Sequence, residues 1–322
     1  MFKSAMLLSC LTLSFMDVKA QSIKDSLLED IATYSPTSYN LLMSHNDLES
    51  SYSYSKGGSR ISTQQNTDTY EFMSWDNYNT ALNSMSTNLH EICHSYNHFI
   101  PYWKMEECDC GIPDLDIIHE GYFISNEENL WIQVDKSLLF PSRELIPHIP
   151  ESKRTFRYKT YIVGEQSAQG HGVLGLLNEF NAYYIGAKYS YDMLPVYERE
   201  DPDWGYVWWS NKMKSLMAAY FEFDFYIKEY LLYAMKYRQD TYDHLKNDLS
   251  FLNIYGTIQN RYRALLSNYE NQYQRYYDKN NKNTDGFRVI MNENPFSTEY
   301  DVLITALSSE RYKSIQDDFR VN

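Results

Sequence analysis

The clearest pattern of apolar and polar positions lies between residues 76 and 99. Apolar side chains recur there in alternating steps of four and three residues, at Tyr78, Leu82, Met85, Leu89, Ile92, Tyr96 and Phe99. This spacing places one apolar stripe along a single side of an α-helix. It predicts a helix over residues 76–99, which Pro101 is expected to end.

A second helical pattern follows a turn that contains Gly164 and Gly172. It predicts an inward-packed helix over residues 173–189, because apolar side chains recur at helical spacing, at Val173, Leu176, Leu177, Phe180, Tyr184 and Ala187. From Ser210 onward the pattern is mainly helical. The helices predicted there cover about 210–239, 241–278 with breaks, and 297–318.

Short runs of apolar and β-branched residues predict three strands. Residues 122–125 and 130–134 are joined by a polar turn, and a third candidate covers 155–163. Residues 50–66, rich in Ser, Tyr, Gly and Gln, and residues 101–118 are predicted to be loops. The fold class expected from these elements is α+β and helix-rich.

A change of composition near residues 195–205 predicts a boundary within the chain. It separates a mixed α+β region, residues 21–200, from a helical C-terminal region, residues 201–322.

The first 20 residues have the character of a secretory signal peptide. Lys3 precedes an apolar run over residues 5–15, and Val18-Lys19-Ala20 has the small-residue pattern of a cleavage site. The run is too short to span a bilayer, and no later stretch approaches the length of a transmembrane anchor. We expect a mature chain that begins near Gln21 and is secreted or held in the periplasm or cell envelope. A lipoprotein signal that ends at Cys10 is the alternative.

Composition limits the classes of partner. The net charge of −14 argues against nucleic acid, because phosphate recognition needs clustered Lys and Arg, and against docking on anionic lipid. The chain holds 31 tyrosines, which either form half-buried surfaces such as a sugar- or peptide-binding cleft or replace Phe and Leu in the core. The oligomeric state is left open.

Three cysteines follow the predicted cleavage site: Cys93, Cys108 and Cys110. An oxidising compartment permits one disulfide. Cys108 and Cys110 are separated by one residue, and we expect them not to bridge each other. Two alternatives remain: a disulfide from Cys93 to either Cys108 or Cys110, or three free thiols.

The segment His90-Glu91-Ile92-Cys93-His94 carries the candidate chemistry. His90 and His94 are four residues apart on the predicted helix, so their imidazoles lie one turn apart on the same side, where one zinc ion can bind both. Glu91 lies beside them and is placed to activate a water molecule. A solvated helix face that carries two histidines by chance is the alternative.

A catalytic zinc site needs a third protein ligand. His98 is excluded by distance, because it lies about 12 Å from His90 along a straight helix, whereas two zinc–nitrogen bonds span about 4 Å. Glu179 is preferred because it lies next to the apolar face of its helix, where an unpaired carboxylate is costly. The alternative third ligands are Glu120, Glu165 and His171.

Two histidines on one helix and a glutamate on a later helix resemble the gluzincins, which are zinc metallopeptidases of the zincin type. The segment Asn178-Glu179-Phe180-Asn181-Ala182-Tyr183 is similar to the one that carries the third ligand in that group. The resemblance is confined to these two short stretches. Glu179 follows His94 by 85 residues, more than in the compact members, and the predicted strands fall inside that gap.

The resemblance implies a zincin-like catalytic lobe with a small sheet, Zn²⁺ as cofactor and a peptide or protein as substrate. Glu91 would be the general base, and Tyr183 would donate a hydrogen bond to the developing oxyanion, with Tyr184 and His171 as alternative donors. A catalytically silent zincin-like protein, or a helical surface or extracellular binding protein, is the alternative function.

Overall fold

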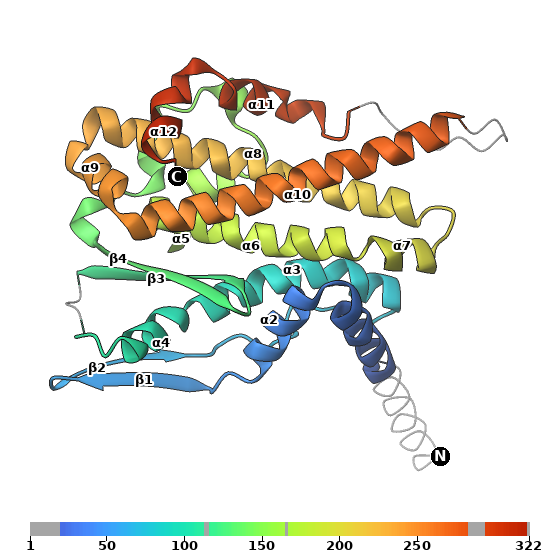
Figure 1. The fold of residues 1–322 in the computed structure, drawn as a ribbon, viewed down its shortest axis with the longest axis horizontal. Coiled ribbons are helices and arrows are strands. Elements are labelled where there is room, and N and C mark those ends of the chain that lie inside the picture. Colours follow the sequence, from blue (N-terminus) through green and yellow to red (C-terminus); the bar gives the residue numbers. More distant parts are fainter. Residues whose placement is uncertain (1–19, 113–115, 165–166, 283–293, 321–322) are drawn as a thin grey trace, which may run out of the picture.

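The structure is a computed structural model that describes residues 20–112, 116–164, 167–282 and 294–320 (Figure 1). The predicted signal peptide, with Cys10, and Glu165 lie outside these residues. The described part is helix-rich and contains two separate two-stranded antiparallel sheets, which confirms the α+β, helix-rich prediction. Within these residues, no helix combines the length and the apolar character needed to cross a membrane.

Helices α3 (Tyr78–Asn97) and α6 (Val173–Asp192) confirm the two main helical predictions and pack directly against each other. Asn77 caps α3, because its side chain accepts a hydrogen bond from the backbone N–H of Thr80. The predicted apolar stripe of α3 is buried at Leu82, Met85, Leu89 and Ile92.

Helix α6 lies between α3 and the long helices α8 (Gly205–Tyr237) and α10 (Leu249–Lys282), as Figure 1 shows. One hydrophobic core runs through all four helices, on both sides of residue 200. The mainly helical C-terminal prediction is confirmed by α8, α10 and three shorter helices, α9 (Gln239–Asn247), α11 (Asp301–Leu307) and α12 (Lys313–Asp318).

The remaining helical elements are short. Residues 20–34 are helical, and the other α-helices are α2 (Pro36–Asn46), α4 (Ile100–Glu107), α5 (Ser167–Gly170) and α7 (Leu194–Glu200). Single turns of 3-10 helix occupy Lys136–Leu138, Ser142–Leu145, Glu151–Lys153, Thr298–Tyr300 and Glu310–Tyr312.

Two strand predictions are confirmed and one loop prediction is wrong. Strands β3 (Ile117–Ser125) and β4 (Glu128–Asp135) form the expected hairpin. The predicted loop at 50–66 is instead a hairpin of β1 (Ser51–Lys56) and β2 (Ser59–Gln64). Gly57 and Gly58 turn it with positive φ angles of 62° and 86°, the conformation of a two-residue hairpin turn.

Two further predictions are wrong. The predicted loop at 101–118 contains α4, because Pro101 lies in the first turn of that helix, where no backbone N–H is required. The predicted strand at 155–163 contains the π-helical turn Lys159–Val163 instead. Tyr158, Tyr161 and Ile162 are buried there with helical rather than alternating spacing.

Cys108 and Cys110 form a disulfide, contrary to the prediction. Asp109 between them has a φ of 50°, a left-handed conformation that turns the chain back on itself. The two Cα atoms are therefore 5.2 Å apart, within the usual range for a disulfide. Cys93 is a free, buried thiol, and burial raises its pKa.

Candidate metal centre

His90 and His94 on α3 face Glu179 on α6 across the contact between the two helices. The Nε2 atoms of the histidines are 3.1 Å apart. One carboxylate oxygen, Oε2 of Glu179, lies 3.4 Å from each of them. Three side chains from two helices thus present one ligand atom each to a common point.

These distances fit a metal ion. A tetrahedral zinc ion with bonds of about 2.0–2.1 Å holds its ligand atoms about 3.3–3.5 Å apart, close to the 3.1 and 3.4 Å found here. Oε2 of Glu179 is also buried without a hydrogen-bond donor among the described residues. A buried carboxylate oxygen without a donor is rare and costly. The group formed by His90, His94 and Glu179 can therefore hold a metal ion.

The charges of the three groups are coupled. Burial alone would raise the pKa of the Glu179 carboxyl, but the His90 and His94 rings beside it hold that pKa well below its usual range. Burial lowers the pKa of His90. Burial also opposes a charge on His94, yet contact with Glu179 outweighs it and raises the pKa of His94 to about 9. Glu179 is therefore ionised, and a proton on His94 competes with any bound cation.

Asn178, the residue before Glu179, orients the second histidine. Its Oδ1 lies 2.6 Å from Nδ1 of His94 and also accepts a hydrogen bond from Asn97. Its Nδ2 donates to Oε2 of Glu120 over 3.0 Å, which settles which end of the amide faces His94. Nδ1 of His94 must therefore carry the hydrogen, and the lone pair of Nε2 is directed at the metal position.

Among the described residues, the alternative third ligands Glu120 and His171 do not complete the group. Buried Glu120 is engaged by Asn178 and by a short hydrogen bond with Nδ1 of His171. That hydrogen bond raises the pKa of His171, because Glu120 stabilises the protonated ring. His98 is exposed at the C-terminal end of α3 and is not part of the ligand group.

Two tyrosines close one side of the centre. The ring of Tyr183 meets the edge of His90, with 4.5 Å between the ring centroids, and its hydroxyl lies 3.1 Å from that of Tyr161. Tyr161 lines the pocket that contains the metal position. Burial raises the pKa of Tyr161, so its hydroxyl keeps its proton as a hydrogen-bond donor. Tyr184 lies elsewhere, with its ring against Tyr262 of α10.

The metal position opens into a pocket of about 390 Å³, which His98, Glu120 and His171 also line. A second pocket of about 640 Å³ extends from Glu91 and His94 to β2. A third, of about 130 Å³, lies on the other side, between Tyr183 and Leu216. Glu91 lines all three pockets, which adjoin the centre and are together called the groove below.

The outer edge of strand β2 lies beside this groove, and the carbonyl of Ser62 on that edge accepts a hydrogen bond from the hydroxyl of Tyr102 over 3.5 Å. The backbone N–H of Gln65 donates to the carbonyl of Ser50, so these two residues form a hydrogen-bonded pair. In an antiparallel ladder, hydrogen-bonded and non-hydrogen-bonded pairs of residues alternate. Ser62 and Gln64 are therefore at non-bonded positions, and their backbone groups point away from β1. Both residues line the pocket next to His94.

Comparison of the sequence with protein-family models and with curated proteins, and of the structure with solved structures, finds no match.

The sequence did not single out Tyr161, and it gave Glu120 only as a possible ligand. Tyr161 lies in segment 155–163, which was predicted to be a strand because it is rich in aromatic and β-branched residues. Asn178 was seen only as part of the segment around Glu179. The sequence did offer one signal for Asn178, because it directly precedes the proposed ligand Glu179. Both side chains lie on the side of α6 that faces α3.

Proposed function

We propose that this protein is an exported zinc metallopeptidase in which His90, His94 and Glu179 hold the metal ion. The observation that carries the proposal is the set of three ligand atoms at tetrahedral spacing, with Oε2 of Glu179 lacking any other partner among the described residues. Two imidazoles and one carboxylate are a ligand set of catalytic zinc sites, which leave one position open. The zincin-like character of the fold, with α3 and α6 as its ligand helices, belongs to the same proposal.

Glu91 is the general base of the proposed reaction. Bound zinc would supply Lewis acidity and lower the pKa of a water molecule. Glu91 follows a ligand directly and lines every pocket of the groove. No basic side chain in the described part of the chain forms an ion pair with it, so its carboxylate is available to take a proton from water and return it to the leaving amine.

The oxyanion of the tetrahedral intermediate needs hydrogen-bond donors. Tyr161 supplies a protonated hydroxyl in the pocket, and Tyr183 holds it through the hydroxyl–hydroxyl contact. His171 supplies a further donor on the Glu120 side of the same pocket. Such donors contribute most when they are already positioned before the reaction.

The outer edge of β2 supports a peptide as the substrate. An extended peptide can pair as an added strand with the outward backbone groups of Gln64, and with those of Ser62 when it replaces the Tyr102 hydroxyl. Its backbone would then run along the groove past Glu91. The Cys108–Cys110 disulfide supports the proposed export, since disulfides persist in oxidising compartments.

Metal analysis and a base-removing variant test the proposal. We expect the chain from Gln21 onward to hold one zinc ion and to cleave members of an unbiased peptide library. Glu91→Gln should keep the zinc and slow cleavage by about 10²–10⁴-fold. Glu310→Gln, on the exposed surface at the far end of the chain, is the matched control and should leave the rate unchanged.

Two outcomes count against the proposal. Full zinc occupancy without cleavage of any library peptide would favour the catalytically silent binding protein. A chain that holds no divalent metal after purification and zinc titration would refute the metal centre itself.

A further inference from the structure

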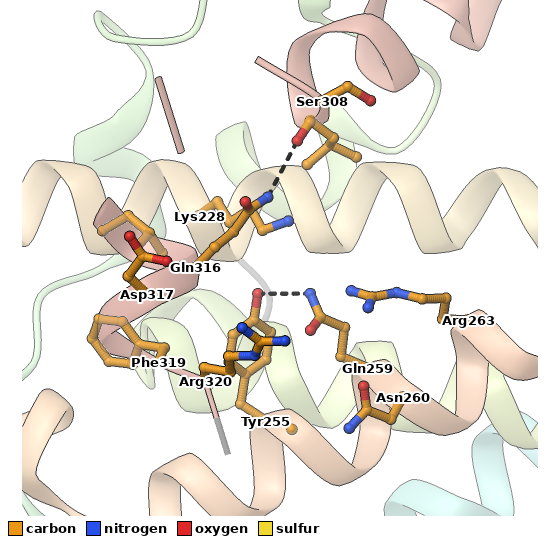
Figure 2. A pocket seen from close by; sticks show the side chains of 13 residues that line it. Lys228, Tyr255, Gln259, Asn260, Arg263, Ser308, Gln316, Asp317, Phe319 and Arg320 are labelled. Atoms are coloured by element: carbon orange, nitrogen blue, oxygen red, sulfur yellow. Dashed lines mark hydrogen bonds between the residues drawn. The ribbon is translucent and has the colours of Figure 1, made fainter. Parts of the chain in front are cut away.

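A pocket of about 680 Å³ lies between α8, α10 and the C-terminal segment that contains α12 (Figure 2). It shares no lining residue with the groove at the metal centre. Helix α6 lies between α3 and the helices α8 and α10 that form the pocket. The volume is within the range of about 300–1,000 Å³ that is typical of small-molecule sites.

Hydrogen-bond donors dominate the lining: Lys228, Gln259, Asn260, Arg263, Gln316 and Arg320. In Figure 2, Arg263 and Arg320 approach Gln259 from opposite sides. Gln259 and Arg263 lie one turn apart on α10, whereas Arg320 comes from the far end of the chain. Arg263 and Arg320 thus bring two guanidinium groups to the lining of one pocket.

The acidic group beneath the pocket is already neutralised. Asp224 accepts hydrogen bonds from the ammonium of Lys228 at 2.7 Å, from Tyr255 at 3.0 Å and from Gln259 at 2.6 Å. Asp224 therefore has three hydrogen-bond donors of its own, and its charge also acts on Arg263 without a direct ion pair. The Lys228 side chain is 4% exposed and has only this one partner among the described residues, although an ammonium has three N–H donors.

The two arginines have no such partner. Among the described residues, Arg263 donates one side-chain hydrogen bond, to the hydroxyl of Tyr220 over 3.4 Å. Among the described residues, neither Arg263 nor Arg320 has a carboxylate within ion-pair distance, although the chain carries a net charge of −14. Asp317 on the exposed rim is the one carboxylate that lines the pocket.

We propose that this pocket binds a small organic anion through a carboxylate or phosphate group held by Arg263 and Arg320. Guanidinium groups match the planar or trigonal arrangement of such oxygens and form short, charge-assisted hydrogen bonds with them. Asn260, on the Arg263 side in Figure 2, and Asp317, on the opposite side, offer acceptors to hydroxyl groups of the ligand. This inference is independent of the peptidase proposal.

Calorimetric titration of the full mature chain with inorganic phosphate and, separately, with citrate tests the site. We expect saturable binding of one anion per chain at low ionic strength. Arg263→Gln and Arg320→Gln should each weaken it by about tenfold or more, since each removes charge-assisted hydrogen bonds. Arg275→Gln, an exposed position farther along α10, is the matched control and should bind as the unaltered chain does.

Circular dichroism of each variant establishes that it folds before it is titrated. Equal affinity in the Arg263, Arg320 and Arg275 variants, or heats that do not saturate, would overturn the proposal. A lipid headgroup is distinguished by sedimentation with phosphatidylcholine vesicles that contain phosphatidic acid. If the chain binds these vesicles through the two arginines but binds neither free phosphate nor free citrate, the proposal of a soluble ligand is refuted.

Discussion

Oδ1 of Asn178 lies 2.6 Å from Nδ1 of His94, and the next residue, Glu179, faces Nε2 of the same imidazole. One turn of α6 therefore supplies a ligand atom and also fixes the tautomer of a second ligand. Glu120 extends this arrangement, because it accepts from Nδ2 of Asn178 and holds His171 on its other oxygen.

Loss of the Asn178 amide should weaken zinc binding. We expect Asn178→Ala to lower zinc affinity about 10–100-fold, because His94 is no longer held in the required tautomer and orientation. Competition with a chromophoric chelator measures the affinity. Asn178→Asp keeps the acceptor for His94 but replaces the donor to Glu120 with a carboxylate, so it should retain only part of the affinity. Unchanged affinity in Asn178→Ala would show that the contact is incidental.

Metal removal should destabilise the fold. A cation that binds only the native state adds about 2.7 kcal/mol at a free concentration of 100 times its dissociation constant. We expect the melting temperature to fall when a chelator removes zinc and to recover when zinc is returned. In Glu179→Gln the chelator should have little effect, because the ionised ligand is absent. An identical melting temperature with and without zinc would contradict the centre.

The two tyrosines of the pocket should differ in their effect on turnover. If the proposed reaction occurs, Tyr161→Phe should lower kcat by about 10²–10³-fold with little change in KM, because it removes a donor used only in the transition state. Tyr183→Phe should have a smaller effect, since its hydroxyl acts through Tyr161. A larger loss in Tyr183→Phe would reverse the two assignments.

The close contact of α3 and α6 sets the ligand spacing. A Cβ added to Gly186 would lie 2.7 Å from the backbone oxygen of Ser86, so Gly186→Ala must push the helices apart. We expect a loss of about 1–3 kcal/mol in the free energy of unfolding, together with weaker zinc binding. Gly170→Ala is the control, because nothing lies within 4 Å of the added atom. Denaturant titration and zinc titration measure the two effects.

Buried His45 should make stability depend on pH. Burial lowers its pKa to about 4 despite the opposing charge of Asp68, and its ring contacts Thr69 and Ser95. The unfolded chain, with an ordinary pKa near 6.5, takes up the proton first, so stability is lost as pH falls from 6.5 towards 4. We expect a loss of about 2–3 kcal/mol between pH 7 and pH 4.5.

Urea unfolding at the two pH values measures this loss. His45→Gln has no titrating ring and should lose less stability over the same interval, although it is less stable at pH 7. An equal loss in both proteins would assign the pH dependence to other groups.

The elements that depend on neighbours within a few residues were predictable from the sequence alone. The stripes of α3 and α6 and the β3–β4 hairpin follow from local periodicity. The same periodicity placed His90 and His94 on one side of a helix and Glu179 beside an apolar face. Their ligand atoms meet at one point because those two apolar faces pack together.

Other features were decided only by contacts between distant segments. The β1–β2 hairpin was missed because Ser and Tyr residues make a weak apolar signal, with Tyr54 the buried member of β1. Tyr161 reaches the centre on a π-helical turn, although its segment has the composition of a strand. Asn178 orients His94 only because α6 lies against α3. Sequence periodicity reports which face of an element is buried, whereas the partner of each polar side chain depends on how those faces pack.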